Sequence, residues 1–176
     1  MTTYVAFLRA INLGGNRTFP KDSIVAATEG VGFTGVATHI NTGNVRFETS
    51  LRSRSKIEST LEQAYLDDRG FDVPTIVFTS AEIAEICAEA ERLASDHSGN
   101  HYVSLLKDEP GSAATAEIEG RSVEGARVVV SGRSVHLLLG ESYRESLLSN
   151  VHVEKVLGVA TNRRLTVIRA LAEKWC

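Results

Sequence analysis

The chain has 176 residues, enough for one domain or two small ones. Hydrophobic residues make up 43% and charged residues 23%, so the composition is that of a globular protein that needs no disulfide or metal ion to fold. The 19 basic and 22 acidic residues give a net charge of −3, which excludes a protein that coats DNA through an overall basic surface.

The start of the chain is apolar without a preceding basic region. The run from Val5 to Leu8 therefore favours a β-strand over a signal peptide. No apolar stretch approaches the roughly 18 residues that a membrane helix needs. Cys87 and Cys176 are far apart and form no CxxC pattern, as is usual in a reducing compartment. We therefore expect a cytoplasmic protein without membrane association.

The first part of the chain predicts the element order β-α-β-β-α-β. The expected elements are a strand over 4–10, a helix from Pro20 to about Val31, strands over 36–40 and 45–48, a helix over 57–65 and a strand over 75–78. The first strand is apolar on both alternations, which predicts a central strand covered on both faces. Pro74 lacks an N–H donor, so the strand that follows it belongs at a sheet edge.

The rest of the chain nearly repeats this order after a linker helix that opens with a capping box, Thr79-Ser80-Ala81-Glu82. The expected elements are that helix to about 93, a strand over 101–106, a weak helix over 113–118, strands over 127–130 and 135–139, a helix over 143–157, a short strand over 160–162 and a last helix over 167–175. We predict an α+β fold of two ferredoxin-like (βαββαβ) lobes, residues 1–79 and 80–176, the second with an additional C-terminal helix.

Several motifs resemble a known family. They are the stretch from Arg9 to Asn16, Pro20, Thr42 to Phe47, Phe71 to Pro74, and the Arg-Glu-Ser-Leu and Ala-Thr-Asn-Arg stretches near the C-terminus. Together they are similar to the uncharacterised bacterial domain-of-unknown-function 1697 family over essentially the whole chain. The resemblance implies two ferredoxin-like lobes and no established activity. The chain departs from the family pattern at Thr42, Leu147 and Arg163-Arg164-Leu165, where Ser, Lys and Asn-Trp-Asn are expected.

In a βαββαβ unit, the loop after the first strand and the turn between the second and third strands lie at one end of the sheet. The candidate ligand-binding residues there are Arg9, Asn12, Gly14, Gly15, Asn16, Arg17, Asn41, Thr42, Gly43 and Asn44. Glycines allow close backbone approach, the helix after Pro20 offers free N–H groups, and the arginines add positive charge, which suits a phosphate or carboxylate. The same residues also fit a purely structural role, with the Gly-Gly pair as a tight turn and the asparagines bonding their own backbone.

A second anion site is a candidate in the second lobe, where the end of the third strand and the end of the fourth share one side of the sheet. Its residues are Tyr143, Arg144, Ser146, Arg163 and Arg164, beside a helix N-terminus. The alternative is a plain capping box, Ser142-x-x-Glu145, with Arg144 paired to a local acid.

The residues predict neither a metal site nor a cofactor. The five histidines are scattered along the chain, and no HExxH, CxxC, Walker or Gly-x-Ser-x-Gly sequence is present. No catalytic pair is identifiable, so the sequence leaves enzymatic activity open. The first hypothesis is a protein that binds a small anionic ligand at the end of the first sheet. The alternatives are an interaction or homo-oligomerisation module, and a nucleic-acid binder that uses its basic loops.

Overall fold

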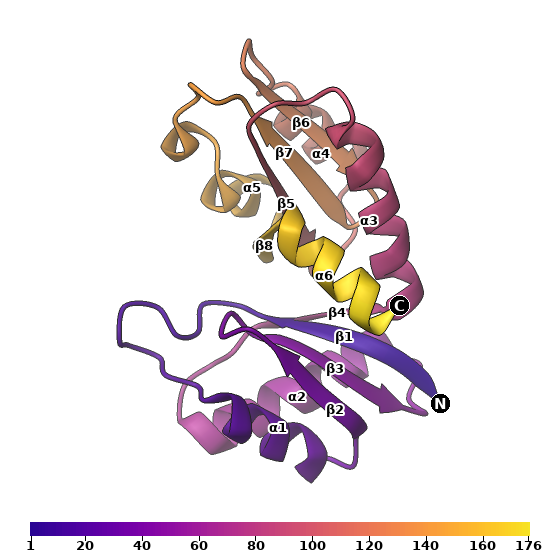
Figure 1. The fold of residues 1–176 in the computed structure, drawn as a ribbon. Coiled ribbons are helices and arrows are strands. Elements are labelled where there is room, and N and C mark those ends of the chain that lie inside the picture. Colours follow the sequence, from indigo (N-terminus) through magenta and orange to yellow (C-terminus); the bar gives the residue numbers. More distant parts are fainter. The chain divides into compact units, whose positions relative to one another are not determined.

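The protein is described by a computed structural model, drawn as a ribbon in Figure 1. It describes the backbone of residues 1–176 and every side chain except that of Ser146. The chain divides into two compact units, Met1–Ile83 with Trp175, and Ala84–Lys174 with Cys176. Each holds a four-stranded antiparallel sheet with helices packed on it. Over the described residues, every helix is too short or too polar to cross a lipid bilayer.

The first unit is the expected βαββαβ arrangement. Its elements are β1 (Thr2–Leu8), α1 (Lys21–Gly30), β2 (Thr34–His39), β3 (Asn44–Thr49), α2 (Arg54–Arg69) and β4 (Thr75–Thr79). The strand order is β2-β3-β1-β4, so β1 is central and β4, which follows Pro74, is at an edge, as predicted. All neighbouring strands are antiparallel, which is the ferredoxin-like topology.

The core of the first unit follows from the alternation of side chains on β1. Tyr4, Ala6 and Leu8 pack with apolar residues of α1 and α2 on one face of the sheet. The polar groups inside this core are paired: the Tyr65 hydroxyl lies 2.9 Å from the Thr28 hydroxyl, which donates to the Ile24 carbonyl. Burial raises the pKa of Tyr65, so its hydroxyl stays protonated.

The second unit contains the second sheet, with order β6-β7-β5-β8. Helix α3 (Ser80–Ala94) begins in the first unit and leads into the second. The elements that follow are β5 (Asn100–Leu106), α4 (Ser112–Glu119), β6 (Ala126–Ser131), β7 (Ser134–Leu139), the 3-10 turn η1 (Glu145–Leu147), α5 (Asn150–Leu157), β8 (Ala160–Arg164) and α6 (Leu165–Trp175). Helices α4 and α5 share an apolar core with one face of the sheet. Helices α3 and α6 lie side by side (Figure 1) and are joined by an ion pair between Glu91 and Arg169.

Two expected helix starts had different outcomes. The capping box at Thr79 is confirmed, since the Thr79 amide donates to the Glu82 carboxylate over 2.7 Å and the Glu82 amide donates to the Thr79 hydroxyl over 3.1 Å. The helix predicted over 143–157 is wrong at its start, because α5 begins at Asn150. The side chain of Ser149 caps that helix together with His152. Because Glu145 accepts bonds from β5 instead, the box expected from Ser142 does not form.

The backbone conformation and surroundings of Gly43 predict that a larger residue at this position destabilises the first unit. Its φ is +79°, and an added Cβ would lie 2.7 Å from the Leu8 Cβ. Replacing Gly43 by Ala therefore combines left-handed strain with overpacking, and we expect it to lower the free energy of unfolding by about 3 kcal/mol. Gly14→Ala is the matched control: φ is +58°, but nothing in the described structure lies within 4 Å of the added Cβ. It should lower the free energy of unfolding by about 1 kcal/mol. Urea denaturation measures both, and equal losses would contradict the role of the Leu8 contact.

Candidate functional site

The end of the first sheet brings together the loop after β1 and the turn before β3. The Asn12 side-chain amide donates to the Asn41 carbonyl over 2.9 Å and to the Phe19 carbonyl over 3.1 Å. The Asn12 side-chain oxygen accepts the Phe19 amide over 2.7 Å. The Leu8 amide donates to the Gly43 carbonyl over 2.8 Å. The topology therefore joins the two predicted segments, and Asn12 is the residue that links them.

Arg17 holds this loop from the other side. Its Nε donates to the Ala10 carbonyl over 2.7 Å, and its terminal nitrogen donates to the Asp72 carbonyl. The guanidinium carbon lies 4.6 Å from the centre of the Phe71 ring. Arg17 thus braces the β1–α1 loop through Ala10 and ties it to the segment before β4 through one hydrogen bond and one cation–π contact.

Backbone strain concentrates at the same end of the sheet. The non-glycine residues with positive φ among those described are Ala10, Asn12, Arg17 and Ile40, and all lie in the two joined segments. Such conformations persist only where surrounding contacts hold them. Gly14, Gly15 and Asn16 stay exposed at the tip of the loop.

The turn between β2 and β3 is held together by the side chain of Asn44. The amide of the buried Asn44 side chain donates to the His39 carbonyl over 2.9 Å and to the Thr42 hydroxyl over 3.0 Å. Arg9 is half-buried, and its backbone amide donates to the Pro74 carbonyl over 2.9 Å. The polar groups of this end are therefore largely used to hold the loop in its conformation, while its glycine tip remains accessible.

The residues expected for a site in the second unit are placed differently from one another. Arg163 is buried and donates to the Thr161 hydroxyl over 2.9 Å and to the Asn162 carbonyl over 2.8 Å. Burial lowers its pKa to about 10. Arg164, on the opposite face of β8, is exposed, and its guanidinium lies 5.3 Å from the centre of the Tyr102 ring.

The other three residues of that expected site belong to the segment before α5. Tyr143 packs against the apolar core of the second unit, and Arg144 is exposed. The side chain of Ser146 lies outside the described residues. Strand alternation thus separates Arg163 from Arg164, and only Arg164 among the five borders the pocket described next.

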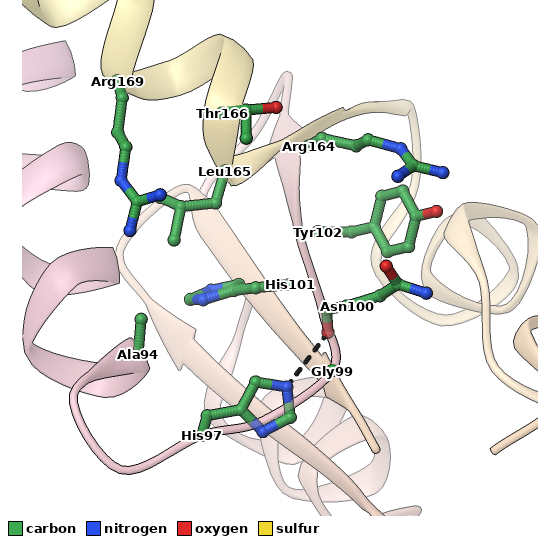
Figure 2. A pocket seen from close by; sticks show the side chains of 10 residues that line it. All are labelled: Ala94, His97, Gly99, Asn100, His101, Tyr102, Arg164, Leu165, Thr166 and Arg169. Carbon is green, nitrogen blue, oxygen red and sulfur yellow. Dashed lines mark hydrogen bonds between the residues drawn. The ribbon is translucent and has the colours of Figure 1, made fainter. Parts of the chain in front are cut away.

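A cavity of about 260 Å³ lies in the second unit at the N-terminus of α6 (Figure 2). Strand β5 with the loop before it, the end of α3, and the β8–α6 junction contribute to its walls. The lining residues are Ala94, His97, Gly99, Asn100, His101, Tyr102, Arg164, Leu165, Thr166 and Arg169. In Figure 2 His101 lies in the middle, with Arg169 on one side and Tyr102 stacked with Arg164 on the other.

The pocket is lined by basic groups. It contains two arginines and two histidines, and no Asp or Glu of the described chain lines it. The first-turn amides of α6 have no intrahelical acceptors, and its N-cap residue Arg164 makes no capping hydrogen bond with its side chain in the described structure. Two carboxylates lie close by: Glu91 pairs with Arg169, and Glu145 accepts from Asn100 over 2.6 Å and from Tyr102 over 2.9 Å.

A buried histidine pair forms the inner wall. His101 is only 7% exposed, and its Nε2 lies 3.1 Å from Nδ1 of His136. His136 is fully buried, and its Nε2 lies 3.4 Å from the Ser134 hydroxyl. Nδ1 of His101 is buried without a hydrogen-bond partner among the described residues.

Both histidines of this pair are held neutral. Burial, reinforced by His136 and His97, lowers the pKa of His101 to about 4. Burial also lowers the pKa of His136 to about 4, with Glu89 opposing and Arg92 assisting the shift. A neutral imidazole in a wall shared with arginines keeps one nitrogen as a hydrogen-bond acceptor.

Sequence reasoning treated the histidines as scattered and so missed this pair. The signal lies in the strand register: His101 is opposite Leu138 and Val103 is opposite His136, so the two histidines are diagonal neighbours on one face of the sheet. The ring centres of His97 and His101 are also 6.4 Å apart. Among the described side chains, no group of three or more His, Cys, Asp or Glu is placed to hold a metal ion.

This chain matches a known protein family in sequence and a solved structure in fold. A family model described as a protein of unknown function, DUF1697, matches residues 1–136. The chain belongs to the DUF1697 family. The matched range includes the family loop at Asn12 and the β5 wall of the pocket, while the arginines of α6 and its N-cap lie beyond it.

The fold of this DUF1697 protein has a solved counterpart. A conserved bacterial protein from Streptococcus pneumoniae matches with a TM-score of 0.76 and 17% sequence identity, over 98% of this chain and 97% of that chain. At this identity the likeness establishes the two-sheet fold alone. No curated protein matches the chain.

The contacts of Arg17 predict a structural role for its guanidinium. Arg17→Ala should lower the free energy of unfolding by about 2 kcal/mol, because the Ala10 and Asp72 carbonyls lose their donor. Arg17→Lys should recover only part of this loss, since an ammonium group cannot form the same planar fork. Arg52→Ala, which removes the same charge from an exposed position, is the control. Urea denaturation measures the three variants, and a loss no larger than that of the control would contradict the role.

The histidine pair predicts acid-sensitive stability. The pKa values of about 4 lie below the ordinary value near 6.5, so between these pH values the unfolded chain binds more protons than the folded one. The contribution of the pair is therefore complete above pH 6.5 and is lost as the pH falls toward 4. We expect the free energy of unfolding to fall over this range with a slope that approaches two protons. His136→Leu should roughly halve that slope in denaturation series at each pH, whereas an unchanged slope would refute the assignment.

Proposed function

We propose that this DUF1697 protein binds a small ligand with a phosphate or carboxylate group in the pocket at the N-terminus of α6. The observation that carries the proposal is the composition of the wall. Arg164, Arg169 and the free first-turn amides of α6 meet there without a lining carboxylate from the described chain. His101, which also lines the pocket, is deeply buried and has a ring nitrogen without a hydrogen-bond partner among the described residues, so a ligand that bonds this residue would satisfy a polar atom that the fold leaves unpaired.

The size of the pocket supports a small ligand. Sites for drug-sized molecules have volumes of roughly 300–1,000 Å³, and this cavity of about 260 Å³ is just below that range. Its charge supports an anion of low charge. Arg169 already pairs with Glu91. Arg164 lies over the Tyr102 ring and interacts with the Tyr102 hydroxyl, and a guanidinium with five N–H donors keeps others able to bond a ligand oxygen.

The end of the first sheet is the second location for such an anion. The exposed Gly14-Gly15 backbone and the first turn of α1 after Pro20 support it. Against it, Arg17 is bonded to two backbone carbonyls and Asn12 is bonded within the loop, so the groups expected to recognise the anion already have partners.

The interaction-module hypothesis has one specific observation in its favour. Leu13 and Ile40, 63% and 49% exposed, both lie in the two segments that meet at the end of the first sheet. Exposed apolar side chains on a loop that is held by hydrogen bonds suit contact with another protein chain. Light scattering of the wild-type protein and of Leu13→Ser with Ile40→Ser distinguishes this function, because the double variant should abolish self-association.

Titration with inorganic phosphate and with acetate tests the proposed pocket. We expect amide chemical-shift changes at Leu165 and Thr166, and an affinity for phosphate that is weaker by roughly ten-fold in Arg164→Gln, because one charge-assisted hydrogen bond is lost. Arg144→Gln is the matched control, an exposed arginine that does not line the cavity, and should bind as the wild type does. Shifts at Gly14–Arg17 instead would move the site to the first sheet, and shifts at neither place would overturn anion binding.

A further inference from the structure

The hydrogen bonds behind the pocket determine which nitrogen of His101 carries a proton. The Ser134 hydroxyl donates to the Ser131 carbonyl over 2.8 Å, so toward His136 it offers only lone pairs. Nε2 of His136, 3.4 Å away, is therefore the N–H donor of that contact, and Nδ1 of His136 is left as an acceptor. Nε2 of His101, 3.1 Å from this acceptor, must then carry the proton.

The consequence is a bare lone pair on a residue of the pocket wall, at an atom that the neighbouring side chains cover. With its proton on Nε2, neutral His101 has an unprotonated Nδ1, and that atom is the buried one without a partner among the described residues. This assignment follows from the hydrogen-bond network, which is how imidazole tautomers are assigned. A lone pair repels the oxygens of a fully ionised phosphate or carboxylate, so a ligand that consists only of such a group leaves Nδ1 unsatisfied.

We propose that the ligand of this pocket is a hydroxylated small anion, such as a hydroxycarboxylate or a polyol phosphate. Its hydroxyl group donates a hydrogen bond to Nδ1 of His101 after the side chains that cover this atom shift. The inference rests on the proposed anion site and specifies its ligand. The anionic group binds at Arg164 and the first turn of α6, and the hydroxyl group binds at His101, all in one cavity (Figure 2).

The surroundings of His101 keep it an acceptor rather than a cation. His97 faces it from the loop before β5, His136 faces it from β7, and Arg169 faces it from α6. Glu91 on α3 acts in the opposite sense but is engaged with Arg169. With the pKa of His101 near 4, the imidazole is neutral at neutral pH and its lone pair persists.

Two matched pairs of probes test the hydroxyl contact by titration calorimetry: lactate against propionate, and glycerol 1-phosphate against propyl phosphate. The members of each pair share the anionic group and differ in hydroxylation. In the wild type we expect the hydroxylated member to bind at least about five-fold more tightly, as one buried hydrogen bond provides. In His101→Leu both members should bind equally. His152→Gln, which changes a histidine outside the pocket in the same unit, should keep the preference.

The tautomer is tested on the wild-type protein without ligand. Long-range ¹H–¹⁵N correlation of the imidazoles at neutral pH should show His101 protonated at Nε2 and bare at Nδ1, and a proton on Nδ1 would overturn the proposal even if His101→Leu fails to fold. Equal binding of the paired probes to the wild type would also overturn it while leaving the anion site in place. If neither member of either pair binds, the anion site is wrong and this inference fails with it.

Discussion

The antiparallel pairing of β5 with β7 and β8 is the constraint on which the pocket depends. The register sets His101 and His136 on the same face, so that the two rings can bond. The same pairing places Arg164 opposite Tyr102 and Arg163 opposite Val103, on alternate faces. A shift of one residue would exchange these faces, burying Arg164 and exposing Arg163, because side chains alternate with a period of two along a strand.

The polar groups of this protein fall into two kinds. Those at the end of the first sheet are saturated: Asn12, Arg17 and Asn44 each bond backbone groups of neighbouring segments. Such contacts explain why non-glycine residues there hold positive φ, since the hydrogen bonds offset the backbone strain. In the second unit, by contrast, a nitrogen of His101 is enclosed without a partner among the side chains that the structure describes. Ser104 Oγ and Asn150 Oδ1 are buried in the same way, but of these three residues only His101 lines the basic pocket.

Much of the fold could be predicted from residues near one another in the chain. The both-faces-apolar run around Val5, the proline before β4 and the Thr79–Glu82 capping box all carry local signals, and each prediction is confirmed. The start of α5 was not predictable in this way. The stretch 143–149 has helical spacing, but Glu145 accepts hydrogen bonds from Asn100 and Tyr102, which are far away in the sequence. Helix α5 therefore begins only after its N-cap residue, Ser149.

The sequence by itself determined the two-sheet α+β topology, the meeting of the Asn12 loop with the Asn41 turn, and membership of the DUF1697 family. These depend on periodicity and turn chemistry, which act over a few residues. Only the tertiary structure decided which polar groups were left open. Arg17 looked available and is bonded to two carbonyls, whereas His101, which looked isolated, lines a cavity beside Arg169. Whether a polar side chain finds a hydrogen-bond partner depends on residues tens of positions away, such as Asp72 for Arg17 and His136 for His101. A local sequence pattern contains no information about such partners.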